Sequence, residues 1–351
     1  MKSTALKIFG TGLIGTSIGL RAAELSWPVS LVDASSGALE VAKDLIPANK
    51  EIQNPELIVI ATTPNSVLSV LSEVSRAYPS STVIDVGSTK TKVQREVDGI
   101  SDLRKRFVGT HPIAGRERSG PQAARSDLFL GRAWVLTPSE EIEPWRLELI
   151  TDFVTAMGAT PYQMSTKQHD ALFAKISHLP QVISIALASS ISELGSEISL
   201  AGQGLRDMLR LAGSDGELWS QILSDNKDEV LSSIDDFQEL LDVLRDAIAD
   251  GDDSRIREMF EDAALVPQKI GGKHGLKRRE YSFVDVVIDD KPGQLATLFE
   301  ECGKIKVNVE DLNLEHSPQQ ETGLIRLALS SSDADVLYQH LLARGWKAHK
   351  Q

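Results

Sequence analysis

Short apolar runs alternate with stretches of helical spacing over the first part of the chain. The runs lie at residues 6–9, 29–32, 57–61, 82–85, 107–109 and 133–136, and the helical stretches include residues 36–45 and 66–76. Strands buried on both faces read as continuous apolar runs, which are typical of parallel sheets covered by helices. The pattern therefore predicts an α/β domain over residues 1–164 with a doubly wound parallel sheet.

From about Ser165 the apolar positions follow helical spacing alone. Ser165 with Gln168, and Ser214 with Glu217, have the spacing of a capping box, which marks a helix start. A long apolar stripe ends at Gly251 and consists of Val230, Leu231, Ile234, Phe237, Leu241, Leu244 and Ile248. Since such a stripe needs a large partner surface, we predict an all-α dimerisation domain over residues 165–270.

The remaining residues return to a mixed pattern. Residues 271–280 are rich in glycine and basic side chains, which predicts a flexible linker. Strand-like runs follow at 281–288, 307–315, 323–330 and 346–349, with helical stretches at 294–302 and 333–344. The order β-α-β-β-α-β predicts a small ferredoxin-like α+β domain over residues 281–351.

The first apolar run ends in a glycine-rich turn, Gly10-Thr11-Gly12-Leu13-Ile14-Gly15. A G-x-G-x-x-G turn between a strand and a helix lets backbone N–H groups approach a pyrophosphate at the positive helix N-terminus. The second run ends in Asp33, where an acidic residue would hold an adenine-ribose 2′-hydroxyl, and no adjacent arginine could receive a 2′-phosphate. The predicted fold is therefore Rossmann-type, with NAD rather than NADP as cofactor.

Two other interpretations of this stretch are weaker. A signal-peptide core is one, because Lys2 and Lys7 precede an apolar block, but no clean cleavage site follows. The other is the nucleophile elbow of serine hydrolases, because residues 15–19 match G-x-S-x-G around Ser17. An elbow needs its serine at the apex of the turn, whereas this turn is already made at residues 10–12, so we expect Ser17 inside the helix.

Composition limits the classes of partner. The 351 residues are 41% hydrophobic, enough for two or three domains, and carry a formal charge of -13, which argues against nucleic acid or an anionic membrane. An anionic substrate would need a local arginine. A single cysteine, Cys302, excludes an internal disulfide, and no Cys/His spacing indicates a metal site. With no apolar run long enough to span a bilayer, we expect a soluble, cytoplasmic protein.

Ligands of such sheets bind beyond the carboxyl ends of the strands. This rule places the glycine turn and residues 62–65, 87–90 and 110–115 around one crevice. His111 lies there, and an imidazole that is mostly neutral at pH 7 can take a proton from a substrate hydroxyl. A loop histidine bonded to the backbone is the competing interpretation.

Several motifs fall in order across residues 5–230. They are the glycine turn with Ser17, the run Asp85-Val86-Gly87-Ser88-Thr89-Lys90, the run from Thr110 to Gly115 with Glu117, the run Ser177-His178-Leu179-Pro180, and the run from Gly202 to Ala212. Together they resemble the prephenate dehydrogenases, a family of the tyrosine pathway that includes arogenate dehydrogenases. The segment from Tyr281 resembles an ACT domain, with residues 290–295 as its ligand loop and Asn308 at the start of its second strand.

The resemblance implies an NAD-dependent oxidative decarboxylation in a homodimer formed through the helical domain, with tyrosine as effector. It makes His111 the base and Ser88 the group that orients the substrate hydroxyl, although a serine there could instead cap the next helix. Arg210 would clamp a substrate carboxylate, the alternatives being a helix pair with Asp207 or Arg206 as the clamp.

Other roles follow from the same resemblance. His178, or a buried structural histidine, and Gln181 fall in the substrate pocket, and cofactor binding is implied for Gly10, Gly12, Leu13, Ile14, Gly15, Asp33, Thr62, Pro64 and Ser88. The family often has a histidine where this chain has Gln181, so prephenate and arogenate both stay open as substrates. A regulator that binds dinucleotide and an amino acid without catalysis is the alternative from another class.

Overall fold

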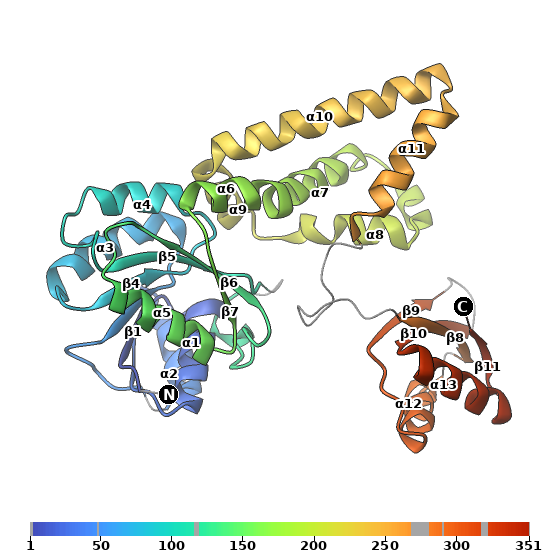
Figure 1. Ribbon diagram of the computed structural model, residues 1–351, viewed down its shortest axis with the longest axis horizontal. Helices are drawn as coiled ribbons and strands as arrows, with labels where there is room; N and C mark the ends of the chain where they lie inside the picture. Colours follow the sequence, from blue (N-terminus) through green and yellow to red (C-terminus); the bar gives the residue numbers. More distant parts are fainter. Residues whose placement is uncertain are drawn as a thin grey trace. The chain divides into compact units, whose positions relative to one another are not determined.

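The computed structural model describes residues 3–47, 49–115, 119–267, 281–289, 291–316 and 322–350. They belong to two compact units, residues 1–267 and 268–351, each described by itself below (Figure 1). The predicted linker at 271–280 lies outside the described residues, as do Glu117 and Asp290 of the motifs above.

A seven-stranded sheet organises the first unit, in the order β2-β1-β3-β4-β5-β6-β7 (Figure 1). Its strands are β1 (Leu6–Phe9), β2 (Val29–Val32), β3 (Leu57–Ile60), β4 (Thr82–Asp85), β5 (Phe107–Pro112), β6 (Ala133–Pro138) and β7 (Thr160–Gln163). Strands β1 to β5 are parallel, as predicted.

The prediction of a wholly parallel sheet is wrong at β6, and the edge strand β7 was not predicted. Strand β6 pairs with β5 antiparallel, and β7 is parallel to β6. A parallel return to a neighbouring strand needs a long crossover, usually a helix, whereas the described residues between β5 and β6 contain only the short 3₁₀ helix Pro121–Ala123. The edge formed by the carboxyl ends of β1 to β5 is unaffected.

Helices cover both faces of this sheet. They are α1 (Leu13–Glu24), α2 (Ser36–Leu45), α3 (Pro64–Ala77), α4 (Thr91–Asp98) and α5 (Pro144–Ala156). Successive residues of β1 belong to different cores, since Ile8 packs in one cluster with Ile18 and Phe9 in another with Val67. Because both faces of the sheet are buried, the strands are unbroken apolar runs in the sequence.

The second half of this unit is helical. Its α-helices are α6 (Thr166–Phe173), α7 (Leu179–Ser190), α8 (Gln203–Leu209), α9 (Gly216–Asp225), α10 (Lys227–Asp250) and α11 (Asp253–Ala264). The capping box of Ser165 and Gln168 is confirmed. The second predicted box is wrong, because Asp215 caps α9 and the Ser214 hydroxyl donates to the carbonyl of Leu211 instead.

Helices α6 and α7 are continuous through a π-helical turn, Ala174–His178. Pro180 lacks an N–H, and its ring crowds the carbonyl four residues earlier, so a widened turn fits there. The stretch Thr166–Ser190 is long and apolar enough to cross a membrane by length and composition, which corrects the expectation that no such run exists. Only 28% of its apolar window is buried in the single chain, but its His169 and Asp170 are buried and hydrogen-bonded within the unit.

The second unit has the predicted β-α-β-β-α-β order. Its elements are β8 (Ser282–Asp289), α12 (Gln294–Lys304), β9 (Asp311–His316), β10 (Thr322–Leu329), α13 (Ser331–Ala343) and β11 (Lys347–Lys350). The strands form an antiparallel sheet in the order β11-β8-β10-β9, the ferredoxin-like arrangement. Its core is separate from those of the first unit.

Candidate active site

Close backbone contacts shape the turn after β1. Gly10 has a φ of +96°, and a Cβ there would lie 2.4 Å from the carbonyl oxygen of Ala61. A Cβ on Gly15 would lie 1.9 Å from the carbonyl oxygen of Gly10, whereas one on Gly12, the N-cap of α1, would meet nothing within 4 Å. The turn therefore offers open space at the positive end of a helix, as a pyrophosphate requires.

Asp33, directly after β2, turns its carboxylate towards this loop. Its Oδ2 accepts hydrogen bonds from the backbone N–H of Thr11 at 2.6 Å and from the Thr11 hydroxyl at 2.8 Å. Its Oδ1 accepts from the N–H of Ser35 at 2.8 Å. The carboxylate is thereby fixed beside the glycine turn, where a bound dinucleotide would present its adenine ribose.

The remaining candidates for cofactor binding flank the same turn. Leu13 and Ile14 open α1 and pack against the core, and Pro64 opens α3. Thr62 follows β3, and its buried hydroxyl has no hydrogen-bond partner among the described residues. Ser17 lies inside α1, as predicted, with its buried hydroxyl accepting the N–H of Arg125 at 3.0 Å, so it is not the serine of a nucleophile elbow.

His111 begins a chain of three side chains. It lies on β5, one residue before the end of the strand. Its Nδ1 is 2.9 Å from Nε2 of His169, and Nδ1 of His169 is 2.8 Å from Oδ1 of Asp170. The ring of Phe173 packs on both imidazoles, with centroids 4.8 Å from His111 and 4.4 Å from His169. Nδ1 of His111 therefore pairs with a side chain, against the interpretation of a backbone-bound histidine.

Asp170 joins the helical half of the unit to the sheet. Its Oδ1 accepts the N–H of Lys90 at 2.9 Å, and its Oδ2 accepts the N–H of Thr91 at 2.7 Å. Because Lys90 is the N-cap of α4 and Thr91 its first residue, a carboxylate from α6 caps α4. The capping role considered for Ser88 is thus wrong, and Ser88 lies half-buried in the loop just before.

A buried ion pair lies under the same loop. Nζ of Lys90 donates to Oδ2 of Asp85 at 2.5 Å and to the carbonyl of Thr110 at 2.7 Å. Burial lowers the pKa of Lys90, and the Asp85 carboxylate opposes this effect. Asp85 also accepts the N–H of Thr110 at 3.2 Å. These bonds fix the loop after β4 to the residue that precedes His111.

His178 is connected to the same network. It is buried at the end of the π-helical turn. The Asn226 side-chain amide donates to the backbone carbonyl of Asp170 at 2.8 Å and lies 3.1 Å from Nδ1 of His178. The structure therefore links His111 and His178 through Asp170.

Gln181 and Arg210 lie at a second junction. Nε2 of the buried Gln181 donates to the carbonyl of Leu211 at 2.8 Å, and the Ser184 hydroxyl donates to the carbonyl of Met208 at 2.7 Å. Arg210 lies between these two carbonyls, at the start of the 3₁₀ turn Arg210–Gly213, and is exposed. His178 thus directly precedes α7, and one turn later α7 carries Gln181, which bonds to the Arg210 turn.

Burial favours neutral imidazoles here. The pKa of His111 is held well below 6.5 mainly because the ring is buried. The electrostatic effects of His169, Lys90 and His178 lower it further. Burial also lowers the pKa of His178 to about 4. Burial alone would raise the pKa of Asp170, but hydrogen bonds from His169, Thr91 and Lys90 outweigh it and bring the pKa to about 2. Across the described ranges, no three His, Cys, Asp or Glu residues are arranged to hold a metal ion.

Sequence reasoning missed His169, Asp170, Lys90 and Asn226 as site residues. The available signal was the adjacent titratable pair, His169 and Asp170, directly after the predicted capping box. Its significance depends on Asp170 meeting Thr91, 79 residues earlier, and periodicity does not encode such a contact.

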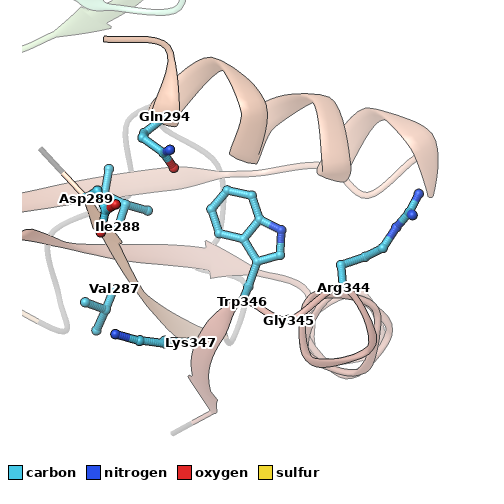
Figure 2. A pocket seen from close by; sticks show the side chains of 8 residues that line it. All are labelled: Val287, Ile288, Asp289, Gln294, Arg344, Gly345, Trp346 and Lys347. Carbon is cyan, nitrogen blue, oxygen red and sulfur yellow. The ribbon is translucent and has the colours of Figure 1, made fainter. Parts of the chain in front are cut away.

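The second unit has a pocket of its own, with a volume of about 250 Å³ (Figure 2). It lies where the end of β8 and the start of α12 face the turn between α13 and β11. Its lining consists of Val287, Ile288, Asp289, Gln294, Arg344, Gly345, Trp346 and Lys347. Figure 2 shows the Trp346 indole between Gln294 and the basic side chains, so the pocket combines an apolar surface with charges of both signs.

Comparison with known proteins gave matches along most of the chain. Residues 19–163 match the family model described as "Prephenate dehydrogenase, nucleotide-binding domain", and residues 165–262 match "Prephenate dehydrogenase, dimerization domain". The protein named "Probable prephenate dehydrogenase NovF" of Streptomyces niveus is 30% identical over 358 residues, with 97% of this chain and 98% of that protein covered. That match necessarily includes the second unit.

Two solved structures match the chain closely in fold. The crystal structure of prephenate dehydrogenase from A. aeolicus in complex with hydroxyphenyl propionate and NAD+ is 25% identical, with a TM-score of 0.71, and 77% of this chain and 99% of that chain are covered. Synechocystis arogenate dehydrogenase is 27% identical, with a TM-score of 0.66 and coverage of 76% and 99%.

Proposed function

This chain belongs to the prephenate dehydrogenase family and is an NAD-dependent oxidoreductase, and we propose that it converts prephenate to 4-hydroxyphenylpyruvate in the crevice around His111. One observation supports this location of the active site. Strands β1, β3, β4 and β5 are parallel neighbours, so the glycine turn, Thr62, Ser88 and His111 follow or end strands at one edge of the sheet. A base and a dinucleotide turn at one edge suit a hydride transfer.

The reaction removes a proton, a hydride and carbon dioxide from one ring. His111 takes the proton of the C4 hydroxyl, and the oxygen electron pair forms a C–O double bond as hydride leaves C4. NAD, when bound, accepts that hydride. The bond from C1 to the carboxylate breaks, its electrons enter the ring, and the phenol recovers its proton. Ser88, in the loop beside Lys90, orients the hydroxyl.

Arg210 holds a substrate carboxylate in this proposal. A guanidinium matches a carboxylate with two parallel hydrogen bonds, which is how a strongly acidic protein would retain an anionic substrate. His178, directly before α7, and Gln181, on α7, are both buried and support the pocket beside it.

A paired assay tests the activity. We expect NADH to form when the protein is given prephenate and NAD. A preference for arogenate would assign the alternative, arogenate dehydrogenase, which Gln181 leaves open and which the likeness to the Synechocystis structure supports. NAD binding without turnover of either acid would instead support a non-catalytic regulator.

We also propose that the protein is a homodimer through its helical half. Large apolar side chains there are exposed in the single chain, among them Ile176, Leu200, Leu240, Ile248 and Phe260, at 59% to 85%. The predicted stripe includes exposed members, Leu231, Leu241 and Ile248, so one chain does not bury it. Light scattering should give twice the chain mass, and Ile248→Glu should reduce it.

The second unit is proposed as an ACT-like domain that binds tyrosine. The pocket at Trp346 offers an indole for the phenol ring, Arg344 and Lys347 for the carboxylate, and Asp289 for the ammonium group. Tyrosine should inhibit the full-length protein. It should inhibit neither a chain that ends at Lys277 nor the full-length Trp346→Ala variant. Equal inhibition of all three would assign tyrosine to the active site instead.

The domain bounds are a further part of the proposal. We place them at 1–164, 165–270, 271–280 and 281–351, and family matches that end at 163 and begin again at 165 support the first of them. We propose a soluble, cytoplasmic location, as the acidic composition suggests, with neither nucleic acid nor membrane as partner.

A further inference from the structure

His169 stands between the proposed base and a carboxylate. It is fully buried, with Nε2 2.9 Å from Nδ1 of His111 and Nδ1 2.8 Å from Oδ1 of Asp170. We propose that His169 is a positioning residue, which fixes His111 in the tautomer with hydrogen on Nδ1 and a lone pair on Nε2. The proposal rests on the proposed function for its kinetic consequence, although the tautomer itself can be measured without any substrate.

The hydrogen positions follow from the acceptors at one end of the chain. Both oxygens of Asp170 accept backbone N–H groups, from Lys90 and Thr91, so the carboxylate is an acceptor on both sides. Nδ1 of His169 must therefore be the donor to Oδ1, which leaves Nε2 of a neutral His169 as an acceptor. The only hydrogen that can occupy the contact between the two rings is then the one on Nδ1 of His111.

This arrangement suits a general base. A neutral imidazole has one N–H and one lone pair, so a hydrogen on Nδ1 leaves Nε2 ready to accept a proton. When the ring takes that proton, its Nδ1–H still faces an acceptor connected to Asp170. Without a partner, His111 would populate both tautomers, and the fraction with the proton on Nε2 could not act as the base at that atom.

A purely structural role for His169 is the alternative. The ring stacks on Phe173 with centroids 4.4 Å apart, and this packing would survive replacement by another flat apolar side chain. Packing does not depend on which nitrogen carries hydrogen. A measurement of the His111 tautomer therefore separates the two roles.

The experiment uses full-length protein with 15N-labelled histidine and long-range 1H–15N spectra at pH 8. The chain has 7 histidines, and the His111 signals are those lost in His111→Asn. We expect Nδ1 of His111 to have the shift of a protonated nitrogen and Nε2 that of an unprotonated one. The opposite assignment in the wild-type protein would overturn the proposal, whether or not any variant folds.

Two substitutions test the dependence on His169. His169→Phe keeps the stacking but removes the acceptor, so His111 should shift to a mixture of tautomers and kcat should fall at least tenfold, with the Kd for NAD changed less than twofold. His169→Gln can present an amide oxygen to Nδ1 and should recover part of kcat. An unchanged His111 tautomer in a folded His169→Phe protein would reduce His169 to packing.

A matched control is the exposed His349→Gln in the second unit, which should change neither the His111 spectrum nor kcat. The failure of the proposed function would look different. In that case neither prephenate nor arogenate would be turned over, while the His111 nitrogens would keep the expected assignment.

Discussion

The carboxylate of Asp170 on α6 accepts the backbone N–H of Thr91, the first residue of α4, at 2.7 Å. A second bond from the N–H of Lys90 completes the cap. Helix starts leave backbone N–H groups without partners inside the helix, and here the partner comes from the other half of the unit. The bond therefore fixes the position of the loop that contains Ser88 and Lys90 relative to α6, the helix that carries His169.

Asp170→Asn should destabilise the protein in a pH-dependent way. The pKa of Asp170 is lowered from 3.8 to about 2, so its charge contributes stability above pH 4 that is lost as the pH falls towards 2. The shift corresponds to about 2 kcal/mol of unfolding free energy at pH 7. Urea denaturation between pH 7 and pH 3 measures the difference from wild type, which should shrink below pH 4.

Asp236→Asn is the control for that measurement. Asp236 forms an exposed pair with Lys175 at 2.8 Å, and such surface pairs contribute little to stability because water screens them. A difference between Asp170→Asn and wild type that stays constant down to pH 3 would mean that the cap does not depend on the charge.

His111→Asn should lower kcat by roughly 10²- to 10⁴-fold, the range for loss of a general base. The Kd for NAD should change little, because the cofactor contacts proposed above are made by other residues. Steady-state kinetics with prephenate and fluorescence titration with NAD separate the two effects. Full kcat in this variant would remove His111 from the mechanism.

The pH profile of kcat/KM offers a test without substitution. Burial and the neighbouring Lys90, His169 and His178 hold the pKa of His111 well below 6.5, against the pull of Asp170. The unprotonated base therefore persists to lower pH than a free imidazole would, and the acid limb of the profile should have its midpoint below 6.5. A midpoint at or above that value would contradict the buried environment described for His111.

Some strands could be predicted from the sequence and others could not. Strands β1 to β5 were predictable because each is buried on at least one face and reads as apolar. Strand β7, with the sequence Thr160-Pro161-Tyr162-Gln163, is mostly exposed at the sheet edge and carries no such signal. The direction of β6 was not predictable either, because alternation of side chains is the same in both directions.

The same limit applies to the site. His111, Ser88 and Asp33 follow or end predicted strands, so the rule for parallel sheets locates them from local sequence alone. His169 and Asp170 lie on a helix, and what they contact depends on how that helix returns to the sheet. The cap on α4 shows the difference, since a local serine was the capping residue that the sequence offered as an alternative and a distant carboxylate is found.

Arg210→Lys should raise KM for prephenate. Lysine keeps the charge but loses the planar pair of donors, and hydrogen bonds to charged groups contribute about 1.5 to 3 kcal/mol. We expect KM to rise by about tenfold or more on that basis. Arg206→Lys, one helical turn earlier, is the matched control and also tests the alternative clamp. If only Arg206→Lys raises KM, the two roles must be exchanged.

Thr11→Val should weaken the discrimination between NAD and NADP. Thr11 is fully buried, and its hydroxyl and its N–H both donate to Oδ2 of Asp33, at 2.8 and 2.6 Å. Valine has nearly the same shape, so the turn should persist while one of the three hydrogen bonds that orient the carboxylate is lost. A less fixed Asp33 can rotate away from a 2′-phosphate, which reduces the repulsion of NADP and weakens the hold on the ribose of NAD. The ratio of the Kd for NADP to the Kd for NAD, measured by fluorescence titration without substrate, should therefore fall by about three- to tenfold. This is the range expected for the loss of one hydrogen bond of about 1 kcal/mol.

Thr16→Val is the control. It removes a hydroxyl that donates to the carbonyl of Thr11 at 2.9 Å, but it leaves both bonds from Thr11 to Asp33 in place, so it should change this ratio less. Equal ratios in wild type and Thr11→Val would show that the backbone N–H groups of Thr11 and Ser35 are sufficient to hold the carboxylate.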